Sequence, residues 1–333
     1  MKKEMTNDMT VGSPAKLIIQ FMIPMCLGNV FQQFYNIADS IIAGQFLGVN
    51  ALAAIGSTGS LMFFVTGWLN GLSSGFAILV SQWFGAKQYD KMRHYVAMSV
   101  YLAGGCAVLM TAGLLIANEP ILRMMNYSAE IMPEVKQYMG IIYAGLIVTA
   151  AYNSLAAFLR AIGDSKSPLY FLIISAVINV ALDVVFIVVF GMGVEGCAYA
   201  TVIAQAISAL LCFIYIVKKF PILHLTKSDR KISFQSFGRL LSLGIPMGLQ
   251  FSITAIGTII VQGAVNVYGE TYMAGFSAAG KLQNMIMTVF VAFGATVATY
   301  VGQNRGAGRM DRVKSGVRCT RGHDISLECD RNG

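Results

Sequence analysis

Long apolar stretches separated by short polar segments form the pattern of this chain. Eight stretches reach the length of about 20 residues that a helix needs to cross the ~30 Å hydrocarbon core of a bilayer. They cover approximately residues 17–46, 52–80, 95–117, 138–159, 169–190, 198–217, 243–267 and 274–300. A segment within lipid must satisfy its own backbone hydrogen bonds, so each stretch is predicted to be a helix. The pattern therefore predicts an all-α polytopic membrane protein.

The composition supports a membrane location. Hydrophobic residues make up 56% of the 333 residues and charged residues only 12%, against roughly 25% charged residues in an ordinary globular protein. So few charges cannot cover the surface of a soluble protein of this size. A soluble enzyme or a nucleic-acid-binding protein is therefore disfavoured.

The basic residues are distributed on alternate sides of the predicted helices. All but three of the 24 Lys and Arg residues lie in the amino-terminal segment, in the segments after the second, fourth and sixth spans, or after the eighth; the exceptions are Arg123, Lys136 and Lys281. Cytoplasmic loops carry such an excess of Lys and Arg. We therefore expect a multi-pass protein of the plasma membrane with both termini in the cytoplasm. The net charge of +8 then needs no nucleic-acid partner.

The two ends of the chain share short motifs at nearly one offset. The sequence Ile-Pro-Met at residues 23–25 recurs at 245–247, and the Gln-x-x-Gly-Ala motif at 82–86 recurs at 303–307. The copies lie in equivalent places of spans one and two and of spans seven and eight, so they predict a parallel repeat of six spans each, an architecture known in transporters. Chance similarity between two hydrophobic hairpins is the alternative.

The second copy has only two spans. We divide the chain into an amino-terminal segment 1–16, a six-helix lobe 17–217, a basic linker 218–239, two helices of a second lobe 240–304, and a polar tail 305–333. The tail has no apolar periodicity where a third span of the second copy is due. A truncated or frame-shifted product explains this better than a designed tail, and a natural eight-span protein with a short tail is the alternative. The full-length expectation is twelve helices.

Three ionisable residues lie inside spans, where a charge costs around 2.5–3.5 kcal/mol at the helix centre and is a functional candidate. Two of them, Asp39 and Asp183, have polar neighbours on the same helical face by the i, i+3, i+4, i+7 rule. For Asp39 these neighbours are Gln32, Tyr35 and Asn36; for Asp183 the neighbour is Asn179.

The two carboxylates are predicted to meet across a cavity. As a coupled pair they would take up a proton or bind a monovalent cation through oxygen ligands, with the hydroxyl of Thr201 in the sixth span completing the set. The alternative is that both residues only form hydrogen bonds between helices. Lys281, the third ionisable residue, either extends to the interface or lines the cavity.

No cofactor site is evident in the sequence. A phosphate-binding loop of the form G-x-x-x-x-G-K-[ST] is absent, which disfavours pumping driven by ATP. The six cysteines lack metal-ligand spacing, and the three histidines form no pattern with partners. We expect neither a catalytic residue nor a cofactor.

Several motifs together resemble the multidrug and toxic compound extrusion (MATE) family of bacterial cation-coupled efflux transporters. The resemblance covers roughly residues 10–315 and rests on the order and spacing of the motifs. They are Ile23-Pro24, residues 35–40 (Tyr-Asn-Ile-Ala-Asp-Ser), Gln82 with residues 85–87, residues 160–164 (Arg-Ala-Ile-Gly-Asp), Asn179 with Asp183, and residues 193–198 (Gly-Val-Glu-Gly-Cys-Ala).

The resemblance implies two six-helix lobes around a central cleft, antiport driven by Na⁺ or H⁺, and export of organic cations. It also implies that Asp39, Asn179, Asp183 and Thr201 match the cation site of the first lobe. Pro24 would match the proline at which the first span bends; a proline inside a helix is a common cause of a kink. The incomplete second lobe is the departure, and it puts alternating access in doubt.

We therefore expect a monomeric secondary antiporter, not an enzyme, that exports small organic cations or other amphipathic molecules across the lipid bilayer. Inward movement of Na⁺ or H⁺ at Asp39 and Asp183 would drive it. Gln32, Tyr35, Asn36 and Lys281 are candidates for lining the cavity. A lipid-linked oligosaccharide flippase, which would need a strongly cationic cavity, is one alternative. A non-transporting helical bundle, or an inactive fragment, is another.

Overall fold

The computed structural model describes residues 8–125, 130–266 and 270–320, and all the regular structure in these ranges is helical. The helices are α1 (Pro14–Phe46), α2 (Val49–Ser57), α3 (Gly59–Gly85), α4 (Tyr89–Met124), α5 (Met132–Ala144), α6 (Leu146–Ala161), α7 (Lys166–Val184), η1 (Val185–Val189), α8 (Val194–Lys219), η2 (Pro221–Leu223), α9 (Phe234–Asn266), α10 (Glu270–Gly306) and α11 (Met310–Thr320). In these ranges seven helices are long and apolar enough to span a membrane, or eight when the bent pair α5–α6 counts as one span. The predicted all-α fold is therefore confirmed.

Two of the predicted spans are each divided into two helices. The second span breaks at Thr58, between α2 and α3, where the Thr58 hydroxyl donates to the Ile55 carbonyl at 2.7 Å. The fourth span bends by 47° between α5 and α6, and Gly145 lies at this bend. A Cβ on Gly145 would lie 2.5 Å from the Val202 side chain of α8, so the absence of a side chain allows the close approach.

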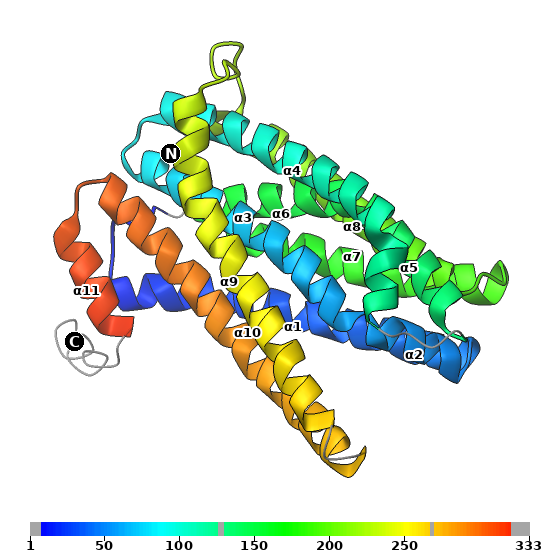
Figure 1. The fold of residues 1–333 in the computed structure, drawn as a ribbon. Coiled ribbons are helices and arrows are strands. Elements are labelled where there is room, and N and C mark those ends of the chain that lie inside the picture. Colours follow the sequence, from blue (N-terminus) through cyan, green and yellow to red (C-terminus); the bar gives the residue numbers. More distant parts are fainter. Residues whose placement is uncertain (1–7, 126–129, 267–269, 321–333) are drawn as a thin grey trace.

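The Lys- and Arg-rich segments gather at one end of the bundle. This end, called here the basic end, holds the start of α1, the α3–α4, α6–α7 and α10–α11 turns, and the segment 220–233 that joins α8 to α9 (Figure 1). All the long helices run between this end and the opposite end. The packing of the basic end therefore connects segments that are far apart in the sequence.

The sequence repeat is visible in the backbone. Both α1 and α9 have 33 residues and an internal proline. The turn after α3 and the turn after α10 each contain a residue in the left-handed region, Lys87 (φ 57°) and Gly308 (φ 72°), at positions 221 apart. The helices that follow, α4 and α11, begin at Tyr89 and Met310, again 221 apart.

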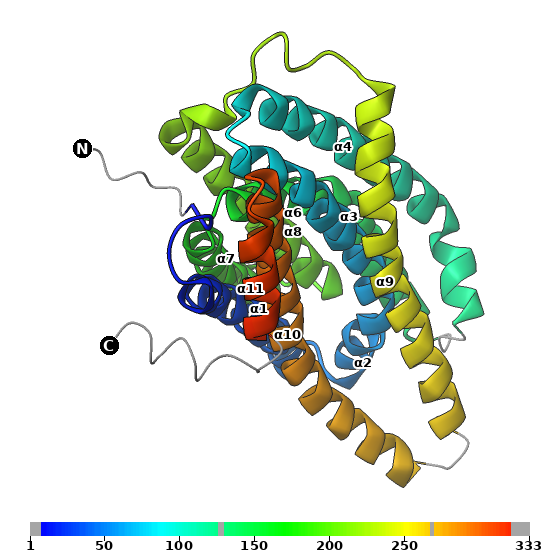
Figure 2. The ribbon, with the colours of Figure 1, turned by 90° about the vertical axis from the view of Figure 1, so that its left-hand side faces the viewer.

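Part of the predicted polar tail, residues 305–333, is helical in the structure. The sequence shows no apolar periodicity after Ser315, and residues up to Thr320 continue the polar helix that begins at Met310. Tyr300 of α10 packs against it, and the Tyr300 hydroxyl donates to the Arg312 carbonyl at 3.2 Å. Figure 2 shows α11 lying across the basic end beside α1 and α10.

Among the side chains that the structure describes, those of α9 and α10 contact the first repeat closely in the halves of the helices near the basic end. A Cβ on Gly71 or Gly75 of α3 would lie 2.6 Å from the Cα of Gly248 or Gly244 of α9. Toward the opposite end the α9 side chains Ile253, Ile256 and Ile260 are exposed, and the α9–α10 hairpin diverges from α1 and α2 (Figure 1). The two parts are therefore closed at the basic end and separated at the other.

Candidate cation site and the hollow between the repeats

Asp39 and Asp183 come together from two helices. The α1 and α7 helices pack side by side, and both aspartates lie in the half of their helix that is farther from the basic end. Their side chains are 6% and 0% exposed and close enough to interact with each other. The structure thus brings together the two carboxylates that the sequence had placed on separate spans.

Thr201 and Asn179 complete the cluster that the sequence predicted. The Thr201 hydroxyl of α8 donates to Asp39 Oδ2 at 3.4 Å, and Asn179 is one helical turn from Asp183 on α7. Thr201 is 6% exposed and Asn179 is 2% exposed. The four side chains come from three helices, α1, α7 and α8.

Several oxygen atoms of this cluster are buried without a hydrogen-bond partner among the residues that the structure describes. They are Asp39 Oδ1, both carboxylate oxygens of Asp183 and the amide oxygen of Asn179. The Asn179 amide nitrogen is also buried without a partner among the described residues. Buried polar groups are usually satisfied, so each exception needs an explanation. Hard oxygen donors of this kind fit a proton shared by the carboxylates or a monovalent cation.

Two side chains near the carboxylates were not predicted from the sequence. Cys197 of α8 interacts with Asp183, and Tyr138 of α5 lies close to both aspartates. Cys197 precedes Thr201 by four positions, so the helical face that carries Thr201 was the signal that could have found it. Tyr138 had no such signal, because its position depends on how α5 packs in the bundle.

A short irregularity follows Asp183. The helix changes to a π-helical turn over Val185–Val189, a feature that appears mostly as single turns and is frequent at functional sites. The apolar sequence of this segment gave no sign of it.

The other candidate residues of α1 differ in their surroundings. Tyr35 interacts with Gln32 on its own helix and with Gln205 of α8, and Gln205 accepts a hydrogen bond from Thr149 of α6. Gln32 is exposed, and Pro24 is buried within an α1 that continues from Pro14 to Phe46. The side chains of Asn36 and Lys281 lie outside the described residues.

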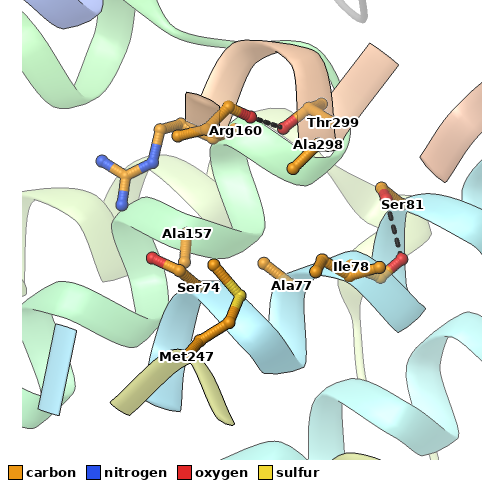
Figure 3. Close-up of a pocket in the computed structure, with 10 residues that line it drawn as sticks. Ser74, Ala77, Ile78, Ser81, Ala157, Arg160, Met247, Ala298 and Thr299 are labelled. Carbon is orange, nitrogen blue, oxygen red and sulfur yellow. Dashed lines mark hydrogen bonds between the residues drawn. The ribbon is translucent and has the colours of Figure 1, made fainter. Parts of the chain in front are cut away.

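A small hollow lies where the two repeats meet. It is lined mainly by small and hydroxyl-bearing residues of α3, α6, α9 and α10: Ser74, Ala77, Ile78, Ser81, Ala157, Arg160, Met247, Ala295, Ala298 and Thr299. Figure 3 shows Ser74, Ala77 and Met247 on one side of it and Ala298 and Thr299 on the other.

The expectation that Arg160 lies in the loop after the fourth span is wrong. The structure places it in the last turn of α6 and on the wall of this hollow, with its guanidinium group directed away from Ser81 (Figure 3). A helix that ends at Ala161 keeps Arg160 within the bundle.

Comparison with known proteins identifies the family. The MatE family model matches residues 24–185. A probable multidrug resistance protein of Bacillus subtilis, YpnP, is 32% identical over 310 residues, which cover 92% of this chain and 68% of that protein. The chain belongs to the MATE family. It is a multi-pass membrane protein of a family of multidrug efflux transporters and not an enzyme.

Other relatives and solved structures agree with this assignment. The probable multidrug resistance protein NorM of Thermotoga maritima is 24% identical, and the match covers 91% of this chain and 66% of that protein. A solved multidrug resistance MATE family transporter in an outward-facing conformation is similar with a TM-score of 0.88 and 23% identity, over 95% of this chain and 70% of that one. The MATE chain described here spans about two thirds of the length of these relatives.

Proposed function

We propose that this MATE chain exports amphipathic small molecules, organic cations among them, in exchange for Na⁺ or H⁺ that enters through the site at Asp39 and Asp183. The observation that carries the proposal is the cluster of buried oxygens in the membrane-spanning helices α1 and α7 that have no hydrogen-bond partner within the described parts of the chain. Two carboxylates, an amide and a hydroxyl supply only hard oxygen ligands, which suit a proton or a small monovalent cation.

The energetics of the site favour exchange. Buried carboxylates are costly when they are charged and unpaired, so the pair is stabilised by taking up a proton or a cation. A site with this property binds when it is accessible from the side of high ion concentration and releases on the other side. Asp39, Asp183, Asn179 and Thr201 would hold the ion, and Pro24 is the position in α1 where a bend would transmit the change.

The arrangement of the two repeats supports an outward-facing state. The repeats are closed at the basic end by the contacts of Gly71 and Gly75 with α9, and they separate toward the opposite end. With the basic end on the cytoplasmic side of the plasma membrane, as the Lys and Arg distribution predicts, the separation faces outward.

The matches to multidrug resistance proteins do not favour the oligosaccharide flippase.

Dye efflux from proteoliposomes tests this function. The chain should export ethidium when a Na⁺ or pH gradient is imposed, and Asp39→Asn or Asp183→Asn should reduce the efflux to the level of empty liposomes. Ser175→Ala is the matched control, because Ser175 is also buried in α7 and donates to the Ala204 carbonyl but carries no charge. Undiminished efflux by Asp39→Asn, or no efflux by the unmodified chain under either gradient, contradicts the proposal.

A further inference from the structure

The segment before α1 is fastened to the second repeat. The Met9 N–H donates to Gln303 Oε1 at 2.9 Å, and the Met9 carbonyl accepts from Asn304 Nδ2 at 3.1 Å and from Arg312 at 3.3 Å. Arg309 donates to the Thr10 carbonyl at 2.8 Å. We call residues 8–13 the amino-terminal strap; it leads into the first repeat but is bound at the α10–α11 turn of the second.

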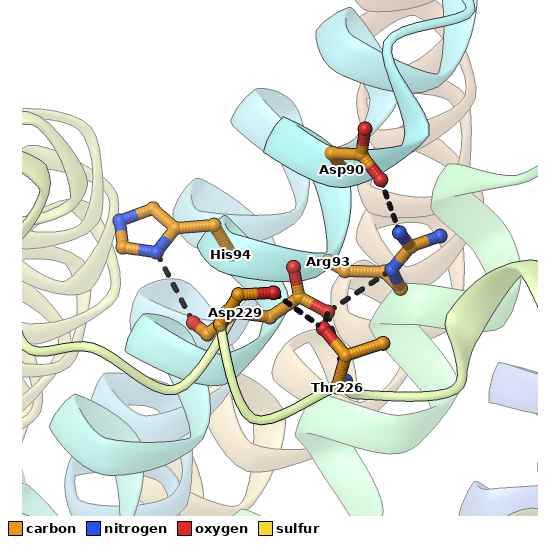
Figure 4. Close-up of polar contacts among 6 residues, drawn as sticks. Asp90, Arg93, His94, Thr226 and Asp229 are labelled. Atoms are coloured by element: carbon orange, nitrogen blue, oxygen red, sulfur yellow. Dashed lines mark hydrogen bonds and ion pairs between the residues drawn. The ribbon is translucent and has the colours of Figure 1, made fainter.

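The segment before α9 is fastened to the first repeat in a similar way. Asp229 Oδ2 accepts from Arg93 Nε at 3.1 Å, and the Asp229 carbonyl accepts from His94 Nδ1 at 3.1 Å. His94 Nε2 also lies 3.0 Å from Ser236 Oγ, at the start of α9. We call residues 226–233 the linker strap; it leads into the second repeat but is bound to α4 of the first (Figure 4).

The two straps occupy equivalent positions in the repeat. Asp8 and Asp229 are 221 positions apart, the offset of the Gly-Ala motifs. Asp8 Oδ1 accepts from the N–H and hydroxyl of Thr10, and Asp229 Oδ2 accepts from the N–H and hydroxyl of Thr226. Each aspartate therefore forms a tight turn, and each turn presents the strap to the other repeat.

The linker strap is held by an ion pair that persists at neutral pH. Burial alone would raise the pKa of Asp229, but the two Thr226 donors and the Arg93 guanidinium together hold the pKa below its usual value. Arg93 also pairs with Asp90 on its own helix. The linker strap is thus fixed by charged hydrogen bonds to a buried carboxylate, and such bonds are stronger than neutral ones.

The straps lie at the place where the repeats touch most closely. The two copies of the Gln-x-x-Gly-Ala motif face each other, because a Cβ on Gly85 would lie 1.9 Å from the Gln303 carbonyl and a Cβ on Gly306 would lie 1.8 Å from the Gln82 carbonyl. Gln303 binds both sides: its Oε1 accepts from Met9 and its Nε2 donates to the Ala161 carbonyl of α6 at 2.9 Å. The straps therefore join the two repeats at the place where the repeats lie closest together.

We propose that the amino-terminal strap and the linker strap are a pair of crossed latches that hold the basic end closed and that must release before this end opens. The hydrogen bonds of the straps suit reversible release, because most of them end on backbone carbonyls, which water can satisfy once Met9, Thr10 and Asp229 leave their buried positions. The consequence for transport rests on the proposed function, whereas the latch itself is a property of the conformational equilibrium and can be tested without transport.

Labelling of a reporter cysteine in the hollow tests the latches. The Ala298→Cys variant is made in the full chain with its native cysteines replaced. A membrane-impermeant maleimide is then applied from the basic-end side of oriented vesicles, and its rate of reaction with this cysteine is measured. Arg93→Ala, which frees the linker strap, and Arg309→Ala with Arg312→Ala, which frees the amino-terminal strap, should each raise the labelling rate on the order of tenfold, equivalent to ~1.4 kcal/mol in the opening equilibrium. Combining them should multiply the two effects, since both latches act on one opening.

Two further variants separate a latch from a loss of folding. Arg123→Ala is the matched control, because Arg123 forms an ion pair with Glu119 at the other end of α4; its labelling rate should not change. The charge exchange Arg93→Asp with Asp229→Arg should restore slow labelling. Unchanged labelling in all strap variants, faster labelling in Arg123→Ala as well, or no recovery in the charge exchange overturns the proposal. Loss of dye efflux with the expected labelling pattern would instead count only against the proposed transport function.

Discussion

Thr201 illustrates how one side chain can set the strength of the candidate site. Its hydroxyl donates to Asp39 Oδ2, and the O···O distance of 3.4 Å is long. The hydroxyl can donate to Asp39 and still offer its lone pairs to an ion. At the residue scale, the site therefore depends on a weak contact that an ion can rearrange.

Replacing Thr201 by Ala should weaken ion coupling without abolishing it. Hydrogen bonds to charged groups contribute about 1.5–3 kcal/mol, and the long distance places this one near or below the lower limit, so the apparent KM for the driving ion should rise by roughly five- to tenfold. The maximal efflux rate should change little. The measurement is efflux as a function of the Na⁺ or H⁺ gradient.

Thr201→Ser is the matched control for this prediction, because it keeps the hydroxyl and removes only the methyl group. Its KM should stay within about twofold of that of the unmodified chain, a difference of ~0.4 kcal/mol. Equal KM values for Thr201→Ala and the unmodified chain would show that the hydroxyl takes no part in coupling.

The α3 helix shows how glycines determine contact between elements. Gly71 and Gly75, one turn apart, lie against Gly248 and Gly244 of α9 with no room for a Cβ. Small residues at such spacing allow two membrane helices to approach closely. At the element scale, closure of the basic end rests on this contact together with the two straps.

Gly75→Ala should disturb this contact. Its Cβ would lie 2.6 Å from the Cα of Gly244, and forcing extra atoms into a packed contact typically costs about 1–3 kcal/mol. We expect a lower melting temperature in detergent and faster maleimide labelling of Ala298→Cys from the basic end.

Gly113→Ala is the matched control, because it makes the same substitution in α4, where nothing lies within 4 Å of the added Cβ. There the Ala should stabilise the helix by roughly 0.5–1 kcal/mol. A melting temperature for Gly75→Ala equal to or above that of Gly113→Ala would contradict the close contact.

The whole molecule is organised about the difference between its two ends. The basic end carries the straps, the facing Gly-Ala motifs and the Lys- and Arg-rich segments. At the opposite end, α9 and α10 together diverge from α1 and α2 (Figure 1). The carboxylate cluster lies in the first repeat, nearer the opposite end. Ion binding and closure of the basic end are thus at different depths, and movement of the repeats must connect them.

The orientation of these ends is predicted from the charge distribution. Lys227 lies in the linker strap, while Lys136 lies at the other end, where it pairs with Glu119. In intact cells, an impermeant maleimide should label Lys136→Cys directly and Lys227→Cys only after permeabilisation. The reverse pattern would place the basic end outside the cell.

The sequence by itself determined the elements and their chemistry. The membrane forces each long apolar run to form its own backbone hydrogen bonds, so helices at residues 17–46 or 169–190 follow from local composition. Helical periodicity also placed Asn179 and Asp183 on one face, and a fixed offset revealed the repeat. These features depend on residues close together in the chain or on direct comparison of two segments.

Only the tertiary structure decided which faces meet. The contact of Asp39 with Thr201, the approach of Cys197 to Asp183, the placing of Arg160 beside the hollow and the crossing of the straps all join residues from separate helices or repeats. The breaks at Thr58 and Gly145 also depend on neighbours such as Val202. Local patterns carry no information on these contacts, because packing between helices far apart in the sequence depends on the shapes of both partners.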